Sequence, residues 1–148
     1  MDLNVVSRDC ASTFKEELSE HGIEVVYDFS STPIHARIDS NLLRGALSNL
    51  IKNAIEAMGG GGKLRLRTER NGHLARIKVG DTGPGIPPEI RPRVFELFFT
   101  TKKGGTGLGL AMASQSIKSL GGSISMEDGG SGGGEFRTTF EIALPLAA

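Results

Sequence analysis

Two asparagines one helical turn apart are among the residues of this chain best suited to chemistry. Asn49 and Asn53 lie in a stretch whose apolar residues recur at helical spacing, and both border its apolar face. Because an amide is costly inside a helix, such a pair calls for a reason. One reason is coordination of a metal ion and phosphates, since an amide oxygen is a neutral ligand that suits Mg²⁺. Two solvated surface amides are the other reading of this pair alone.

A carboxylate followed by two glycines forms the second motif. Asp81 comes directly after an alternating stretch over 75–79, and Gly83 and Gly85 follow it. A carboxylate at the end of a strand can accept a hydrogen bond from an exocyclic amine, and glycines let a flat ring approach the backbone. This favours recognition of adenine, although an ordinary Asp-Gly turn fits the motif equally well.

The third motif is a glycine-dense start to a predicted helix, Gly-Thr-Gly-Leu-Gly-Leu over 105–110. Such a start presents backbone N–H groups and the positive end of the helix dipole, both of which attract phosphates. Lys102, Lys103 and Arg93 add positive charge nearby. A glycine linker and solvated surface charges explain each feature alone. The three motifs together describe a nucleotide site.

Composition narrows the classes of function. The 148 residues suit one domain, and 17 basic against 17 acidic side chains disfavour a general nucleic-acid binder. The lone Cys10 excludes an internal disulfide, and the three histidines lack the spacing of metal ligands. No apolar run approaches the roughly 18 residues that span a bilayer, so we expect a cytoplasmic segment without membrane contact.

The elements that must position these motifs are mixed. We expect helices over 7–21, 40–58 and 107–120, a short helical piece over 92–98, and strands over 23–29, 63–70, 75–79, 123–127 and 135–144. We expect residues 3–6 to be extended. The Asn71–Gly72 pair predicts a hairpin between the second and third strands. The mixture predicts an α+β fold or a two-layer α/β sandwich.

In this order, the motifs resemble those of the catalytic and ATP-binding domain of bacterial two-component sensor histidine kinases, whose superfamily includes DNA gyrase and the heat-shock chaperone ATPases. Residues 49–53 resemble the N box, 81–85 the first G box, 95–102 the F box and 105–110 the second G box. The resemblance covers almost the whole chain. It implies one catalytic domain over 1–148 with the Bergerat fold, a mixed, mostly antiparallel sheet on three helices, and an ATP lid at about 95–106.

The resemblance also implies a ligand set for Mg²⁺ and for the adenine of ATP. Asn53 would ligate Mg²⁺, and Asn49 would support the metal and the phosphates. Asp81 would bind the adenine amino group together with Thr138. Gly83, Gly85 and Ile86 would shape the adenine pocket.

For the phosphates, the resemblance implies cations and backbone N–H groups. Arg93 would approach the terminal phosphate, and Lys102 would be a cation of the lid. The second G box supplies the remaining positions of the implied site, which are Thr106, Gly107, Leu108 and Gly109. The residues implied to be catalytic are Asn49, Arg93 and Lys102.

Departures from the family pattern bear on the reaction. Glu56 and Ala57 stand where many relatives carry a lysine and an aromatic residue. Hydrolytic relatives have a glutamate at the position of Asn49, and an amide cannot act as that base. We therefore predict weak intrinsic ATPase activity and transfer of the phosphate to a histidine instead.

The implied acceptor histidine is not in this sequence, because none of its histidines lies in a His-Glu helix. The expected partners are thus a histidine-bearing dimerisation and phosphoacceptor domain, normally on the same polypeptide, and a response regulator downstream. Two alternatives stay open at this point. One is a free-standing serine kinase of the anti-sigma-factor type, and the other is a nucleotide-binding adaptor without kinase activity.

Overall fold

A five-stranded sheet forms one layer of the molecule. The computed structural model describes residues 1–97, 99, 108–127 and 135–146. In spatial order the strands are β1 (Ile23–Asp28), β2 (Gly62–Asn71), β3 (Leu74–Asp81), β5 (Thr138–Pro145) and β4 (Ser123–Met126). β1 pairs with β2 in parallel, and the other three pairs are antiparallel. The predicted mixed, mostly antiparallel sheet is confirmed.

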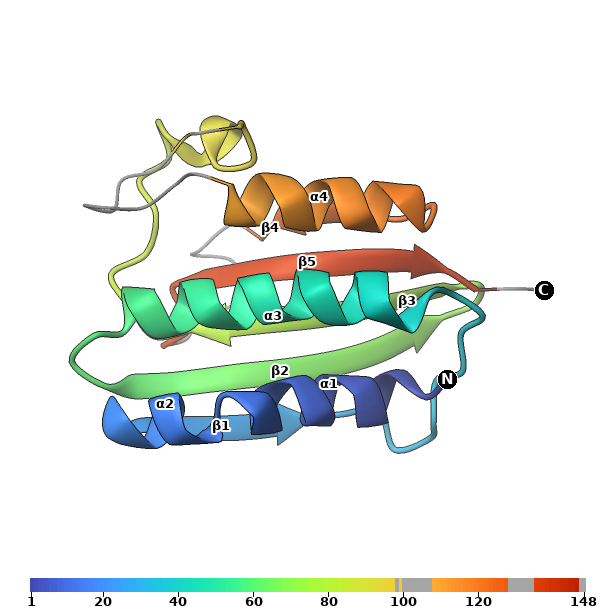
Figure 1. The fold of residues 1–148 in the computed structure, drawn as a ribbon, viewed down its shortest axis with the longest axis horizontal. Coiled ribbons are helices and arrows are strands. Elements are labelled where there is room, and N and C mark those ends of the chain that lie inside the picture. Colours follow the sequence, from blue (N-terminus) through green and yellow to red (C-terminus); the bar gives the residue numbers. More distant parts are fainter. Residues whose placement is uncertain (98, 100–107, 128–134, 147–148) are drawn as a thin grey trace.

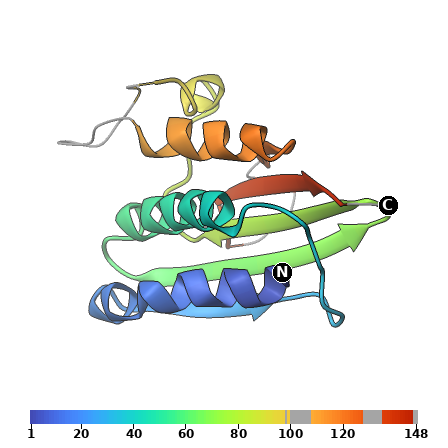
Figure 2. The same ribbon diagram turned by 45° about the vertical axis from the view of Figure 1, so that its right-hand side comes forward.

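Helices cover one face of this sheet as the second layer (Figure 1 and Figure 2). They are α1 (Leu3–Thr13), α2 (Lys15–Glu20), α3 (Ser40–Ala57) and α4 (Gly109–Ser119), with a short 3₁₀ turn, η1 (Arg91–Arg93), before α4. α1 and α2 run almost in line along β1 and β2, while α3 and α4 lie side by side over the middle and far edge of the sheet (Figure 1). The two-layer sandwich predicted from the sequence is confirmed.

The N-terminal helix differs from its prediction in two ways. Residues 3–6, expected to be extended, form the first turn of α1, because the carboxylate of Asp2 caps the helix by accepting a hydrogen bond from Asn4 N at 3.0 Å. The helix expected over 7–21 is also interrupted at Phe14, whose φ of −100° and ψ of 15° are not helical. The sequence over 3–6 is compatible with a strand or a helix, and the N-cap at Asp2 favours the helix.

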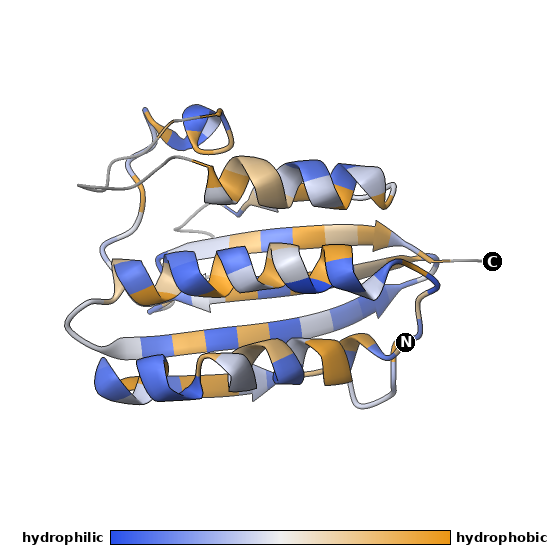
Figure 3. Ribbon diagram, in the orientation of Figure 1, coloured by the Kyte–Doolittle hydropathy of each residue, from blue (hydrophilic) through white to orange (hydrophobic). Residues whose placement is uncertain are grey.

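The core lies between the two layers. Inward-facing residues of the central hairpin alternate with polar ones, and Leu64, Leu66, Ile77 and Val79 are at most 1% exposed. Leu43, Leu47, Leu50 and Ile51 of α3 are fully buried against them. Each such side chain stabilises the fold by roughly 1.5–3 kcal/mol through loss of apolar contact with water. Figure 3 shows the same alternation as orange and blue bands along β2.

The face of the sheet away from the helices carries a charged network centred on Lys78 of β3. Its ammonium group lies 2.6 Å from Glu127, 3.4 Å from Glu69 and 3.8 Å from Glu141, so one cation links residues of β2 and β5 with the end of β4. Arg76 adds an ion pair with Glu141 at 3.3 Å. The polar residues of the alternating strands thus pair across neighbouring strands rather than only facing water.

Within the described residues, none of the helices combines the length and the apolar composition needed to cross a membrane.

Candidate functional site

The long helix α3 sets the position of the two asparagines. Asp39 caps its N-terminus, accepting hydrogen bonds from Asn41 N at 2.9 Å and Leu42 N at 3.4 Å. The buried apolar stripe then fixes the rotation of the helix about its axis. Asn49 and Asn53 are consequently half-buried at the border of that stripe. The helix predicted to carry both amides is confirmed.

At the end of β3, two buried polar side chains face each other across the sheet. Asp81 is 2% exposed and Thr138 is 4% exposed, and the two residues are register partners of β3 and β5. One carboxylate oxygen of Asp81 accepts a hydrogen bond from Gly83 N at 2.9 Å, which closes the turn that follows. The resemblance implied that Asp81 and Thr138 share one site, and the structure brings them together.

The glycines after Asp81 are required by the backbone itself. A Cβ atom at Gly83 would lie 3.0 Å from the carbonyl oxygen of Ala57, at the C-terminus of α3. Gly85 has a φ of +84°, a conformation that other residues rarely adopt. The turn can therefore lie against the end of α3 because neither residue carries a side chain.

A threonine connects this turn to its neighbours. Thr82 Oγ1 accepts a hydrogen bond from Lys63 N at 3.0 Å and donates one to the sulfur of Met58 at 3.5 Å. The start of β2, the end of α3 and the turn after β3 thus meet at one side chain. Sequence reasoning missed this contact, because nothing local in the glycine motif indicates which elements Thr82 reaches.

The start of α4 lies next to Asn49. A Cβ atom built on Gly109, the first residue of α4, would be 3.6 Å from Asn49 Oδ1. Leu108 occupies the N-cap position, and among the described residues no side-chain hydrogen bond caps this helix. The N-terminal end of α4, with its positive dipole, therefore lies beside Asn49 of α3.

The structure does not bring every expected phosphate ligand into this arrangement. Arg93 Nε pairs with Glu96 at 3.4 Å, and its guanidinium group lies 4.7 Å from the centre of the Phe99 ring. Both contacts stay within its own segment. Lys102, Thr106 and Gly107, and with them most of the expected lid over 95–106, lie outside the described residues.

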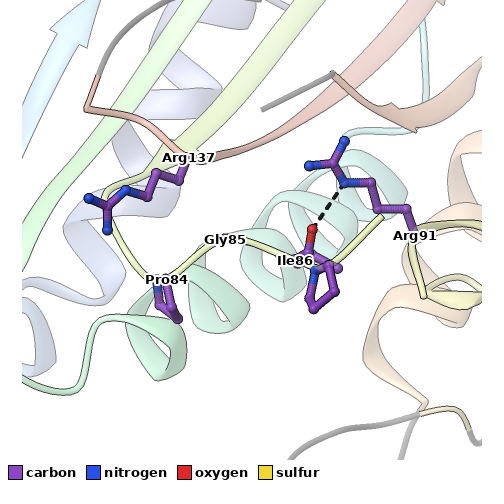
Figure 4. Close-up of a pocket in the computed structure, with 6 residues that line it drawn as sticks. Pro84, Gly85, Ile86, Arg91 and Arg137 are labelled. Atoms are coloured by element: carbon purple, nitrogen blue, oxygen red, sulfur yellow. Dashed lines mark hydrogen bonds between the residues drawn. The ribbon is translucent and has the colours of Figure 1, made fainter. Parts of the chain in front are cut away.

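Two arginines that sequence reasoning did not single out border a pocket beside the turn. This pocket, of about 410 Å³, is lined by Pro84, Gly85, Ile86, Pro87, Arg91 and Arg137. Arg91 Nε donates a hydrogen bond to the carbonyl oxygen of Ile86 at 3.0 Å, and Arg137 lies on the other side of the turn (Figure 4). The sequence signal available for them was weak, since each arginine lies outside the glycine motif.

The donor set restricts the chemistry. No group of three or more His, Cys, Asp or Glu side chains that could hold a metal ion occurs among the described residues. What the site does offer is amide oxygens, one buried carboxylate, a helix N-terminus and a glycine turn. These groups suit a ligand that combines a flat base with phosphates better than a metal held by protein alone.

Comparison with known proteins agrees with this geometry. The family model described as "Histidine kinase-, DNA gyrase B-, and HSP90-like ATPase" matches residues 38–148. Nitrogen regulation protein NtrY of Azorhizobium caulinodans is 38% identical over 133 residues, which cover 84% of this chain and 17% of that protein. The chain therefore spans about a sixth of the length of this relative.

Solved structures give the same result for the fold. The catalytic domain of histidine kinase ThkA has a TM-score of 0.87 and 31% identity, covering all of this chain and 97% of that chain. ThkA in complex with response regulator protein TrrA matches with a TM-score of 0.84 and 28% identity, covering 99% of this chain and 41% of that chain. The chain belongs to the family of histidine kinase-, DNA gyrase B- and HSP90-like ATPases, and within it to the catalytic domains of sensor histidine kinases.

Proposed function

We propose that this chain binds Mg-ATP and transfers the terminal phosphate to a histidine on a separate phosphoacceptor domain. The observation that carries the proposal is the buried Asp81–Thr138 pair, held beside a glycine turn and on the same side of the sheet as the amides of α3. The relatives support the histidine as acceptor, because those named above are histidine kinases or nitrogen-regulation proteins rather than serine kinases of the anti-sigma-factor type. Since ATP is a cytoplasmic metabolite, the proposal places the domain in the cytoplasm.

Asp81 would select the base. Its second carboxylate oxygen would accept a hydrogen bond from the exocyclic amine of adenine while the first keeps the turn closed through Gly83 N. Thr138, buried opposite, can donate or accept a further bond. A guanine presents a carbonyl oxygen where adenine presents an amine, so the carboxylate would repel it.

Asn49, Asn53 and the start of α4 would hold the phosphates and the metal. The phosphates would lie between the amides of α3 and the N–H groups after Leu108, with Gly109 permitting close approach. Bound Mg²⁺ would neutralise phosphate charge, and Asn53 would supply an amide oxygen to it. Transfer then depends on positioning and charge neutralisation rather than on a protein nucleophile. Arg93 and Lys102, together with Thr106 and Gly107, are proposed to act when the lid closes.

The proposal assigns the remaining parts of the reaction to partners. A dimeric helical domain would present the acceptor histidine, normally within the same polypeptide, and a response regulator would receive the phosphate next. The complex of ThkA with response regulator protein TrrA supports such a partner. Asn49, which cannot act as a base for water, favours transfer over hydrolysis.

Calorimetric titration tests the nucleotide site. A non-hydrolysable ATP analogue is titrated with and without Mg²⁺ into the wild-type chain, Asn53→Ala and the control Asn41→Ala, an exposed amide at the start of the same helix. We expect Mg²⁺ to strengthen binding about tenfold or more in the wild type and the control, and to have little effect in Asn53→Ala. Equal affinity of the wild type for the analogue with and without Mg²⁺ would contradict the assigned role of Asn53.

A second experiment tests the acceptor. The chain is mixed with Mg-ATP labelled on the terminal phosphate and with the phosphoacceptor domain of a nitrogen-regulation-type kinase, alone or with its acceptor histidine replaced by glutamine. We expect acid-labile label on the phosphoacceptor domain that keeps its histidine, and none on the domain in which glutamine replaces it. If nucleotide binds but no acid-labile label forms, the chain is an adaptor instead.

A further inference from the structure

On the helix-free face of the sheet, an aromatic ring fills the space that a glycine leaves open. A Cβ atom at Gly80 would lie 3.4 Å from Phe136 Cδ1 and 3.5 Å from Phe136 Cβ. Gly80 is the register partner of Arg65 in β2, and the guanidinium carbon of Arg65 lies 4.4 Å from the centre of the Phe136 ring. Phe136 therefore packs on β3 under the side chain of Arg65, an arrangement that we name the Arg65–Phe136 stack.

Within the described part of the chain, the contact with the Phe136 ring is the main interaction of the Arg65 side chain. Its Nε atom is buried and has no hydrogen-bond partner among the described residues. Arg67, two residues further on the same face of β2, pairs instead with Asp28 at 3.6 Å and Glu69 at 3.8 Å. Arg65 is half-buried, and a guanidinium group partly removed from water over a ring is held more strongly than a fully exposed one, because the charge has fewer competing partners.

Glu135, the residue before Phe136, is also held by β2. Lys63 Nζ lies 3.1 Å from Glu135 Oε1, and Lys63 points to the same face as Arg65 because it is two residues away. This ion pair is about half exposed, so it contributes little alone. Together, the two contacts fix consecutive residues of the chain just before β5 begins.

The residues after Phe136 are those that face the proposed base site. The Cβ atom of Arg137 lies 3.5 Å from where a Cβ atom of Gly85 would be, and Thr138 is the register partner of Asp81. Displacement of Phe136 would therefore move both walls of the site, although the ring itself is on the opposite face of the sheet. Gly80, directly before Asp81, lets the ring approach β3 at this point.

Resting on the nucleotide-binding function proposed above, we infer that Arg65 and Phe136 are positioning residues for the base of the bound nucleotide. Through the stack they hold Arg137 against Gly85 and Thr138 opposite Asp81, so that the site is shaped for adenine before the ligand arrives. Neither residue touches the ligand. Their effect is on nucleotide affinity and base selectivity, and phosphate contacts at α3 and α4 are independent of it.

Titration of ATP and GTP analogues into Arg65→Ala, Phe136→Leu and the matched control Arg67→Ala tests this. We expect Arg65→Ala and Phe136→Leu each to weaken binding of the ATP analogue about threefold to tenfold and to leave the weak binding of the GTP analogue unchanged. The ratio of the two affinities, ATP analogue over GTP analogue, should therefore fall by the same factor. Arg67→Ala should bind both analogues within about twofold of the wild type. The double variant should lose no more than the larger single loss, because both substitutions break one contact.

A stack with a merely structural role gives a different result. In that case Arg65→Ala lowers the melting temperature but binds both analogues with wild-type affinity and preference, and the inference is overturned. If Arg65→Ala does not fold, Phe136→Leu supplies the same readout, because leucine keeps apolar contact with β3. Equal ATP binding by wild type and Phe136→Leu would overturn positioning while leaving the proposed function intact. A wild-type chain that binds neither analogue would overturn both.

Discussion

At the scale of single residues, Asp81 combines one observed function, closing the turn after β3, with one proposed function, binding the base, and the sequence could not separate the two. Its position after a strand and before two glycines predicted both a base-binding carboxylate and an ordinary turn. The structure shows the turn directly, with Gly83 N donating to the carboxylate at 2.9 Å, and buries the side chain to 2% exposure opposite Thr138. The two functions use different properties of the side chain, so substitution can distinguish them.

Replacing Asp81 with asparagine should weaken ATP binding about tenfold or more, because a hydrogen bond to a charged acceptor is worth roughly 1.5–3 kcal/mol. The substituted amide would keep an oxygen for Gly83 N, so the free energy of unfolding should change by less than about 1 kcal/mol. Asp81→Ala should lose both affinity and about 1–3 kcal/mol of stability, because Gly83 N is then left without its acceptor. Calorimetric titration and urea unfolding measure the two effects. Wild-type affinity in Asp81→Asn would exclude a role for the charge.

At the scale of elements, features that have a local sequence signal were predicted better than the ends of strands, which depend on long-range contacts. The Asn-Gly pair predicted the hairpin, but its loop is Gly72–His73, with Gly72 at φ +62° and Asn71 still paired in β2. Strand β5 begins at Thr138 rather than near 135. Contacts next to the start of β5, such as Phe136 packed on Gly80, join residues far apart in sequence and leave no local periodicity.

The junction of α3, β2 and the turn after β3 depends on one glycine. Gly62 has a φ of +152°, and a Cβ atom there would collide with Thr82 Oγ1 and lie 2.9 Å from the sulfur of Met58. Gly62→Ala should therefore lower the free energy of unfolding by about 3 kcal/mol, through backbone strain and overpacking. Gly60→Ala is the matched control, since nothing lies within 4 Å of its Cβ position. Equal urea midpoints for the two variants would show that the junction relaxes without cost.

The charged network predicts how stability depends on alkaline pH. Burial lowers the pKa of Lys78, but hydrogen bonds and charges of Glu127 and Glu69 outweigh it and raise the pKa above its ordinary value of 10.5. A raised lysine pKa contributes stability that is complete below pH 10.5 and is lost as pH rises through the folded-state pKa. The stability difference between wild type and Lys78→Met should thus be constant from neutral pH to about pH 10 and shrink above it. Urea unfolding at a series of pH values measures this, and a difference that grows with pH would contradict the assignment.

At the scale of the whole molecule, the motifs predicted the family and the layers because four of them stand in a fixed order along the chain. The two-layer fold and the helix that carries both amides follow from periodicity, since alternating strands with one apolar face need a covering layer. The parallel pairing of β1 with β2 could not be predicted this way, because no local signal records which strand lies beside another. Arg91 and Arg137 were missed for the same reason, since only the fold places both at the lining of one pocket (Figure 4).

That strand order has a consequence for how the chain folds. The loop of the β2–β3 hairpin has two residues. By contrast, α3 lies between β1 and β2 in the sequence. Paired residues of β3 and β5 are 57 or more positions apart in sequence, the smallest separation being that of Asp81 and Thr138. Because closing long loops costs entropy before any contact forms, the hairpin and α3 should form first, and β1 and β5 should join them later. In pulsed hydrogen exchange during refolding, amides of β3 should be protected before those of β1 and β5. Asp81 would then be in place while Thr138 is still unfolded, so nucleotide added during refolding should speed the final phase without changing the first.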